Sequence, residues 1–240
     1  MKKTVFIGFI AALCCMMFAS CEKKDETTDG TGNSVNLSRD LAALYTFDNG
    51  TCNDASGRGC HGAANGSVTY VNDTPSKQGK AVAIDGTSRQ FINIPYDLIG
   101  DSINFSFSIW LKDFGTGRIV YSVGCAPGFY VNADCTPVIN GSRDEINFSY
   151  NLEKYQAAGW HMFTVTASRT THKLKLYIDG GLVDAKEAYP GQYNHTKTQI
   201  GGNGDGRFDA WADPMIVDNF RVYRRCLNDK EVRELYNLER

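Results

Sequence analysis

Residues 105–112 have the sequence Phe-Ser-Phe-Ser-Ile-Trp-Leu-Lys, in which apolar and polar side chains alternate. The four apolar residues at odd positions share one face of an extended strand, and Trp110 lies on the other face with the serines and the lysine. This period of two predicts a β-strand that buries one side in a core.

The same alternation recurs along the chain from Leu41 onward. It predicts further strands at 41–47, 91–94, 119–123, 146–150, 160–167, 174–178 and 216–223. Turn sequences separate them, and Asp179-Gly180-Gly181 is typical of a tight hairpin. Many short strands joined by turns predict an all-β, two-sheet jelly-roll sandwich.

A single helix is expected at the C-terminal end. Asn228 and Glu231 have the spacing of a capping box, and Val232, Leu235 and Tyr236 follow at helical spacing. The sequence therefore predicts a short C-terminal helix that packs on the sandwich.

Two segments resemble the ends of one known kind of domain. Residues 44–62 contain an aromatic strand, Phe-Asp, and then Asp-x-Ser-Gly-x-Gly-x-His-Gly, and residues 217–237 resemble a closing strand and short helix. Together they make the chain, from about Leu41 to Asn237, similar to LamG-like jelly-roll domains of the concanavalin A-like lectin/glucanase superfamily. The resemblance implies the fold and leaves function open, because this sandwich hosts lectins, hydrolases and adhesion modules.

The N-terminal residues resemble an export signal. Residues 1–20 combine two lysines with an apolar stretch, and Phe18-Ala19-Ser20-Cys21 resembles a bacterial lipobox, which implies lipidation of Cys21. Polar residues 21–37 predict a flexible tether, and residues 38–240 form the LamG-like domain. We expect a lipid-anchored outer-membrane protein exposed at the cell surface; soluble secretion and a periplasmic orientation are the alternatives.

Composition limits the partners. The formal net charge of −2 gives no electrostatic case for nucleic acid. No second apolar run is long enough to cross a bilayer, so membrane attachment is expected through the lipid anchor only.

Two cysteine pairs each flank a short loop, Cys52 with Cys60 and Cys125 with Cys135. In an exported protein such pairs are candidates for local disulfides, although the sequence leaves connectivity open. Cys226 is interpreted as a small core residue.

Asp218 has the same strand parity as apolar neighbours, which places a carboxylate on the predicted core face. Burying it is costly unless a cation or several donors accompany it. The family resemblance implies a structural calcium ion held by Asp48, Asp54 and Asp218. The alternative is that Asp218 only accepts hydrogen bonds from loop amides.

Aromatic residues beside polar groups are candidates for ligand binding. Trp211 and Phe208, with Arg207 nearby, could form a platform for a sugar, and Trp110 on the polar strand face could line a groove. No catalytic residue is assigned, because the Glu-x-Asp-x-x-Glu strand of laminarinase-type relatives is not found in the sequence.

These features predict a non-catalytic, surface-anchored, lectin-like lipoprotein that binds a polysaccharide or host glycan. A protein-interaction or adhesion module, or an accessory subunit of an outer-membrane complex, is the alternative. A glycoside hydrolase with an unfamiliar carboxylate pair is the third hypothesis.

Overall fold

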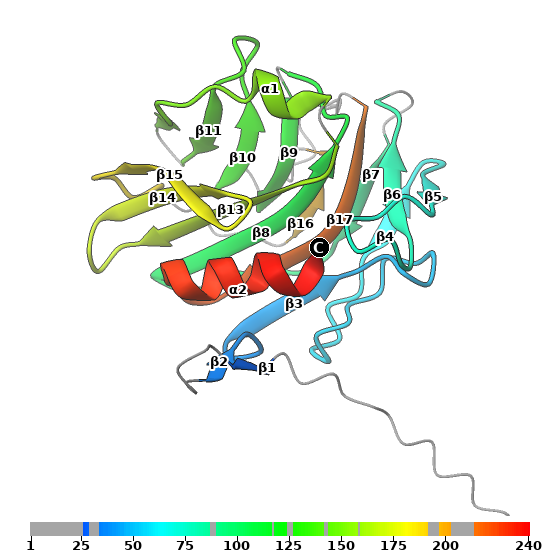
Figure 1. Cartoon of the computed structure of the whole chain (residues 1–240), viewed down its shortest axis with the longest axis horizontal. Helices are drawn as coiled ribbons and strands as arrows, with labels where there is room; N and C mark the ends of the chain where they lie inside the picture. The colour runs from blue at the N-terminus through cyan, green and yellow to red at the C-terminus, as the bar shows by residue number, and fades with distance from the viewer. Residues whose placement is uncertain are drawn as a thin grey trace, which may run out of the picture.

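The computed structural model describes residues 26–28, 34–86, 90–116, 118–123, 127–141, 144–157, 159–191, 197–202 and 214–240. Most of them form two antiparallel sheets that pack face to face (Figure 1). The helices are α1 (Glu153–Gln156) and α2 (Asp229–Glu239). The strands are β1 (Glu26–Thr28), β2 (Ser34–Asn36), β3 (Leu41–Tyr45), β4 (Ala63–Asn65), β5 (Thr69–Val71), β6 (Ala81–Ile84), β7 (Phe91–Ile94), β8 (Asn104–Lys112), β9 (Arg118–Val123), β10 (Gly128–Val131), β11 (Pro137–Asn140), β12 (Glu145–Asn147), β13 (His161–Ser168), β14 (Lys173–Ile178), β15 (Gly181–Lys186), β16 (Thr198–Ile200) and β17 (Met215–Tyr223).

One sheet has seven strands in the order β12-β11-β10-β9-β16-β7-β4, and the other has eight in the order β15-β14-β13-β8-β17-β6-β5, with β3 also paired to β17. Strands far apart in sequence are neighbours in both sheets, as in β8 beside β17. The predicted all-β jelly-roll sandwich with a short C-terminal helix is confirmed.

The core lies between the sheets because each strand turns its apolar face inward. In β8, all four odd-numbered apolar residues from Phe105 to Leu111 are buried in the core, as the alternation predicts. Across six strands of the seven-stranded sheet, from β7 to β12, one row of cross-strand partners is apolar: Ile92, Ile200, Tyr121, Phe129, Ile139 and Ile146. The two faces meet in an aromatic cluster in which the Phe107 and Tyr121 ring centroids are 4.6 Å apart.

The outer face of the eight-stranded sheet is covered by α2, drawn in red in Figure 1. Its first turn is fixed by the predicted capping box: the Glu231 amide donates to Asn228 Oδ1 at 2.9 Å, and Glu231 Oε2 accepts from the Asn228 amide at 2.8 Å. Val232 and Leu235 are buried against the sheet. In the described part of the chain, no helix is long and apolar enough to cross a lipid bilayer.

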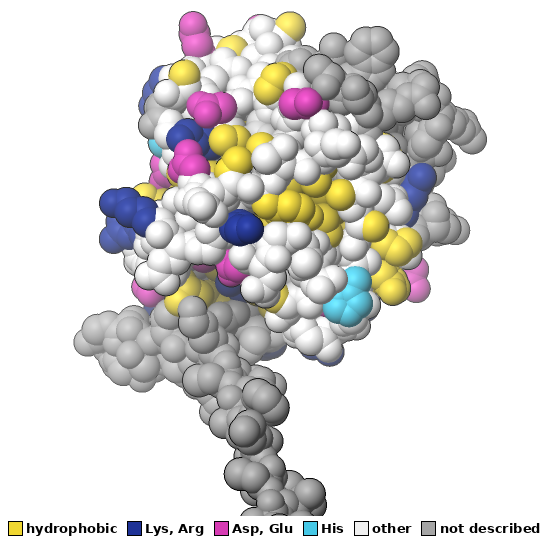
Figure 2. Space-filling view, turned by 90° about the vertical axis from the view of Figure 1, so that its right-hand side faces the viewer, with side chains coloured by type: hydrophobic (Ala, Val, Ile, Leu, Met, Phe, Trp, Pro, Cys, Tyr) yellow, Lys and Arg dark blue, Asp and Glu magenta, His cyan; other side chains and the backbone are white. Residues whose placement is uncertain are grey.

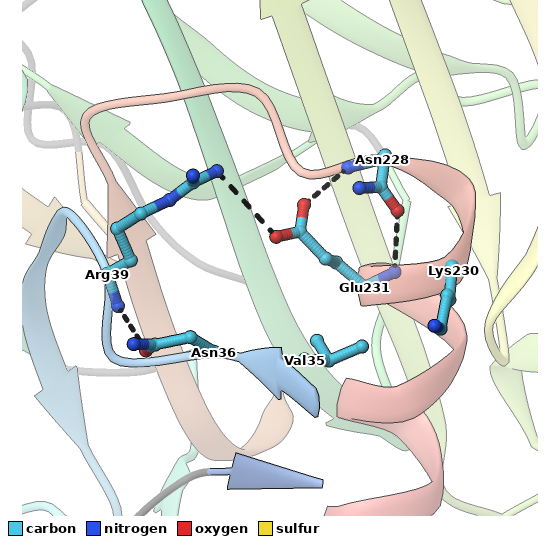
Figure 3. Close-up of a pocket in the computed structure, with 6 residues that line it drawn as sticks. All are labelled: Val35, Asn36, Arg39, Asn228, Lys230 and Glu231. Carbon is cyan, nitrogen blue, oxygen red and sulfur yellow. Dashed lines mark hydrogen bonds and ion pairs between the residues drawn. The ribbon is translucent and has the colours of Figure 1, made fainter. Parts of the chain in front are cut away.

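An N-terminal arm, residues 34–40, lies against the start of α2. Figure 3 shows Arg39 and Asn228 on either side of Glu231, with Arg39 Nη2 3.9 Å from Glu231 Oε1. The Arg225 guanidinium donates to the Asn36 carbonyl at 3.2 Å and bonds Glu231 Oε2 at 2.7 Å. The arm is therefore attached to the domain by hydrogen bonds and an ion pair.

The arm changes the end of the predicted 21–37 tether. Val35 and Leu37 are buried in the apolar cluster between α2 and the sheet. Both side chains are apolar and pack against the apolar residues of this cluster. The residues before them include β1, which pairs with β2 in a separate two-stranded sheet. The packed domain thus begins before residue 38.

On one side of the sandwich, the edge strands of the two sheets are β4 and β5. All three residues of β4, Ala63–Asn65, are exposed because β4 is the outermost strand of its sheet. Figure 2 faces this side and shows hydrophobic side chains gathered near its centre, between isolated charged groups.

Candidate functional site

A surface hollow of about 590 Å³ lies beside α1, in the connection from β12 to β13, and is lined by Tyr150, Asn151, Glu153 and Lys154. Figure 1 places α1 at the top of the molecule, at the end opposite to β1 and β2.

The short connection is shaped by one buried residue and one amide side chain. Leu152 is fully buried, and its amide donates to the Cys135 carbonyl at 2.9 Å. Asn151 Oδ1 accepts from the Glu153 amide at 2.9 Å, and its Nδ2 donates to the Asp134 carbonyl at 3.0 Å. Because Leu152 points into the core, the residues on either side of it are left at the surface.

Two tyrosines form the aromatic part of the site. The Tyr150 and Tyr155 rings stack with centroids 6.3 Å apart and an interplanar angle of 28°, and their hydroxyl oxygens are 3.0 Å apart. Lys154 Nζ lies 4.9 Å from the Tyr155 centroid and 5.8 Å from the Tyr150 centroid. The lysine is thus within cation–π range of both rings.

The electrostatics of the three groups are linked. Hydrogen bonds to Tyr155 and Tyr150 raise the pKa of Lys154, so the ammonium is retained. Burial raises the pKa of Tyr155, and its hydrogen bond to Tyr150 adds to this, while Lys154 opposes it. The Tyr155 phenol therefore stays protonated and able to donate at neutral pH.

Tyr155 is held from beneath by β13. Its ring packs edge-on against His161, with centroids 4.7 Å apart, and against Phe163 at 6.3 Å. His161 Nδ1 lies 2.7 Å from Asp179 Oδ2, and Asp179 Oδ1 accepts from the Met162 amide at 3.0 Å. An ionised carboxylate only accepts, so Nδ1 carries the proton in this pair. The Tyr155 ring is thus supported by paired strands of the eight-stranded sheet.

The chemistry of this site is that of a binding surface. Aromatic faces beside hydrogen-bonding groups suit a ring that is apolar on its faces and polar at its edges. Among the four lining residues, Glu153 is the single carboxylate, whereas glycosidic cleavage ordinarily uses two facing ones.

The sugar platform predicted from the sequence consists of other residues than the Tyr150–Tyr155 pair. Trp211, Arg207 and Phe208 lie outside the described residues. The prediction that Trp110 lines a groove is wrong: it is 2 % exposed, stacks on Tyr236 at 5.5 Å, and donates from Nε1 to Glu239 Oε2 at 2.7 Å. Trp110 does lie on the outer strand face, but α2 covers that face.

Asp54 organises the opening loop. Its carboxylate accepts from the amides of Leu44 (3.0 Å), Ser56 (2.8 Å) and Cys60 (3.1 Å). Burial acts to raise the pKa of Asp54, but these hydrogen bonds hold it below its usual value. In the described part of the chain no three His, Cys, Asp or Glu side chains form a metal-binding group. The prediction that three aspartates bind one ion is therefore wrong for Asp54, whose carboxylate accepts hydrogen bonds from backbone amides of the opening loop.

Asp218 occupies a β-bulge. The register of β17 against β8 shifts between Asp218 and Arg221, and Asn219 has a left-handed φ of 45°. The bulge reverses the alternation, so Val217 and Phe220 face the core while Asp218 pairs with Trp110 on the other side. The prediction that Asp218 lies on the core face is wrong for this reason, although the side chain is buried, at 2 % exposure.

The surroundings of the Asp218 carboxyl group disfavour its ionised form. Burial raises its pKa to about 8; the Asn219 amide, 2.7 Å away, opposes the shift, and the negative charges of Asp48 and Glu239 add to it. Asp48 lies directly over Gly79, where any side chain would collide with its carboxylate. The charges of Asp48 and Asp218, which lie far apart in the sequence, thus interact, and two carboxylates are donors that suit a hard divalent cation.

The predicted disulfides do not form in the described residues. Cys52, Cys60 and Cys135 are free thiols, and Cys125 lies outside the described residues. Cys52 is buried with its sulfur 3.2 Å from the Tyr70 hydroxyl, so it packs toward β5. Cys226, which the sequence analysis assigned to the core, is partly exposed and donates from Sγ to the Ala167 carbonyl at 3.0 Å.

Sequence reasoning missed Tyr150 and Tyr155. Tyr150 was assigned to the end of a strand and Tyr155 to no element, and the available signal was two tyrosines five residues apart around Asn-Leu-Glu-Lys.

Comparison with known proteins gives one family and many similar structures. The sequence profile of the concanavalin A-like lectin/glucanases superfamily matches residues 85–233. No curated protein sequence matches the chain.

Domain 4 of AbnA, a GH43 extracellular arabinanase from Geobacillus stearothermophilus, solved with arabinotriose, is 19 % identical with a TM-score of 0.61, over 82 % of this chain and 98 % of that domain. The binding domain of Paraclostridial mosquitocidal protein 1 is 19 % identical (TM-score 0.66), over 84 % of this chain and 53 % of that one. The binding domain of botulinum neurotoxin DC, solved with SialylT, is 16 % identical (TM-score 0.65), over 84 % and 52 %. The chain therefore spans about half the length of the toxin binding domains, and at these identities the likeness concerns the fold.

Proposed function

This chain belongs to the concanavalin A-like lectin/glucanase superfamily, and from that premise we propose that it is a non-catalytic carbohydrate-binding module whose binding surface is the hollow beside α1. The observation that carries the proposal is the stacked pair of Tyr150 and Tyr155 at a surface hollow. Tyrosine rings provide large, rigid contact area, and their hydroxyls provide hydrogen bonds to sugar hydroxyls.

The similar structures support a glycan ahead of a protein as the partner. AbnA domain 4, which the chain matches over almost its whole length, was solved with arabinotriose. A botulinum neurotoxin DC binding domain was solved with SialylT and also with rat synaptotagmin II, so a protein partner is the second candidate. Binding rather than hydrolysis is favoured because the hollow has one carboxylate among its lining residues.

We further propose that Cys21 carries a lipid anchor and that the domain stands at the surface of an outer membrane. The packed arm begins at residue 34, so a segment of 13 residues from Cys21 would connect it to the lipid. Strand β2 of the arm and α1 lie at opposite ends of the molecule (Figure 1), and since the hollow is beside α1, this arrangement would present it away from the membrane. Several acyl chains, at about 0.8 kcal/mol per buried CH₂, suffice for a lasting anchor.

We propose calcium as a structural ion held by Asp48 and Asp218, with backbone carbonyls as the remaining oxygen ligands. The support is the buried Asp218 carboxylate, whose pKa of about 8 reflects burial and the nearby charges of Asp48 and Glu239. A bound cation would relieve this repulsion and tie the opening loop to β17.

Replacing Asp218 by asparagine tests the ion through pH. The native carboxyl keeps its proton up to about pH 8, whereas the unfolded chain releases it near pH 4, so without calcium this group lowers stability as pH rises between those values. Asp218→Asn is therefore expected to be more stable than the natural chain at pH 8.5 in chelator, by up to about 5 kcal/mol, and equal to it near pH 4. Urea unfolding at both pH values measures this difference.

The same experiment with added calcium completes the test. Calcium should stabilise the natural chain and leave Asp218→Asn unchanged, because ligands that bind only the native state raise its stability. A natural chain whose unfolding midpoint does not respond to calcium would remove the proposed ion.

The proposed function is tested by a polysaccharide and glycan array probed with the purified full-length chain in mild detergent. We expect specific binding to at least one glycan. A folded chain that binds no glycan, and that instead captures one defined surface protein, would favour the adhesion function.

A further inference from the structure

The hollow concentrates hydrogen-bond donors in one place. Lys154 Nζ lies 4.9 Å from the Tyr155 ring centroid and 5.8 Å from the Tyr150 ring centroid, and the two hydroxyl oxygens are 3.0 Å apart. An ammonium has three donors and no acceptor, and each phenol has one donor. Within this cluster one phenol donates to the other, so the second O–H and the donors of the ammonium remain for an acceptor outside.

The charge of Lys154 is not neutralised by the described residues around it. No carboxylate in the described ranges lies within ion-pair distance of Lys154, whereas Lys112, Lys173, Lys175 and Lys186 each have such a partner. The lysine is exposed and lies over the Tyr150 and Tyr155 rings, so its ammonium is open to a ligand in the hollow.

The other polar groups that line the hollow form no ion pair or hydrogen bond with Lys154 in the described residues. Both ends of the Asn151 amide are engaged locally, with the Glu153 amide and the Asp134 carbonyl. Glu153 also lines the hollow but forms no ion pair with Lys154, and its negative charge adds to the burial that raises the pKa of the Cys135 thiol. The group that the Lys154 cluster lacks is an anion with several acceptor oxygens.

Resting on the carbohydrate-binding function proposed above, we propose that the hollow selects a sugar bearing an anionic group, a carboxylate or a sulfate ester, which Lys154 and the hydroxyls of Tyr150 and Tyr155 bind together. Charge-assisted hydrogen bonds are shorter and stronger than neutral ones, and the aromatic faces remain available to the sugar ring.

The test uses matched pairs of oligosaccharides with the full-length chain in mild detergent at low salt. The carboxylate pair is tetragalacturonate and its carboxyl-reduced form; the sulfate pair is a carrageenan tetrasaccharide and its desulfated form. We expect at least one anionic member to bind about tenfold more tightly than its neutral counterpart, the size of one hydrogen bond to a charged group. The pair that shows the preference identifies the anionic group.

Three variants locate the preference. Lys154→Gln should reduce it to near unity without changing the melting temperature, because this side chain is exposed. Lys154→Arg should retain it. Lys173→Gln, the matched control at an exposed lysine of β14 that is paired with Glu187 away from the hollow, should leave the preference intact.

The outcomes separate the two proposals. Equal binding of both members of each pair, or a preference that survives in Lys154→Gln, overturns the anionic ligand while leaving carbohydrate binding in place. A folded chain that binds no glycan on the array and none of the four probes overturns both.

Discussion

Glu239→Gln is expected to destabilise the domain by about 3–5 kcal/mol, because it removes one charge of a buried ion pair. Arg221 Nε lies 2.6 Å from Glu239 Oε1, and the two side chains are 5 % and 4 % exposed. The other carboxylate oxygen accepts from Trp110 Nε1 at 2.7 Å. This one carboxylate therefore holds the end of α2 on the outer face of the eight-stranded sheet.

Urea unfolding followed by tryptophan fluorescence measures the effect, since Trp110 lies under α2. The matched control is Glu234→Gln on the same helix, which is expected to change stability by less than about 0.5 kcal/mol because the described residues give Glu234 no ion pair. Equal stabilities for the two variants would contradict the role assigned to the Arg221–Glu239 pair.

Tyr150→Ala is expected to weaken glycan binding about thirtyfold, equivalent to about 2 kcal/mol, the loss typical of a central aromatic contact. The substitution removes one of the two stacked rings and one hydroxyl of the cluster. Tyr150→Phe keeps the ring and loses the hydroxyl, so its loss should be smaller. Isothermal titration calorimetry with the best glycan from the array measures all three affinities.

Tyr96→Ala is the control for the loss of an exposed tyrosine. Tyr96 is 41 % exposed and follows β7, on the far side of the seven-stranded sheet from β12. Its removal should leave the affinity unchanged. Equal affinities for the natural chain and a folded Tyr150→Ala variant would contradict binding at the hollow.

The sandwich was predictable from the sequence because successive side chains of each long strand point alternately to the core and to the outer face of the sheet. The odd-numbered residues of β8 are buried between the sheets, as expected. What alternation does not reveal is what covers the second face. Trp110 stands on the predicted side of β8, yet α2, more than 100 residues later in the chain, buries it.

Asp218 shows how one backbone irregularity changes the assignment of a side chain. Counting by twos from Phe220 places Asp218 in the core, but the bulge before Arg221 moves it to the α2 side of the sheet. A bulge adds one residue to one strand and leaves no reliable signature in the pattern of apolar residues. The engagement of Asp54 by loop amides was not predictable either, because it depends on the conformation of the opening loop.

The hollow was not predicted because it depends on a short irregular connection. Leu152 is an ordinary apolar residue in the sequence, and its burial is what leaves Tyr150 and Lys154 at the surface. Two tyrosines five residues apart suit neither a helix face nor one side of a strand. Their stacking follows from the turn into α1 and from the support of His161 and Phe163.

A crystal structure of the chain with its tightest-binding oligosaccharide tests the central claim most directly. We predict a sugar ring within about 4 Å of the Tyr150 ring, with an oxygen of the sugar accepting from Lys154 Nζ. An oligosaccharide bound elsewhere on the domain, with the hollow beside α1 free of it, would contradict the site proposed for this protein.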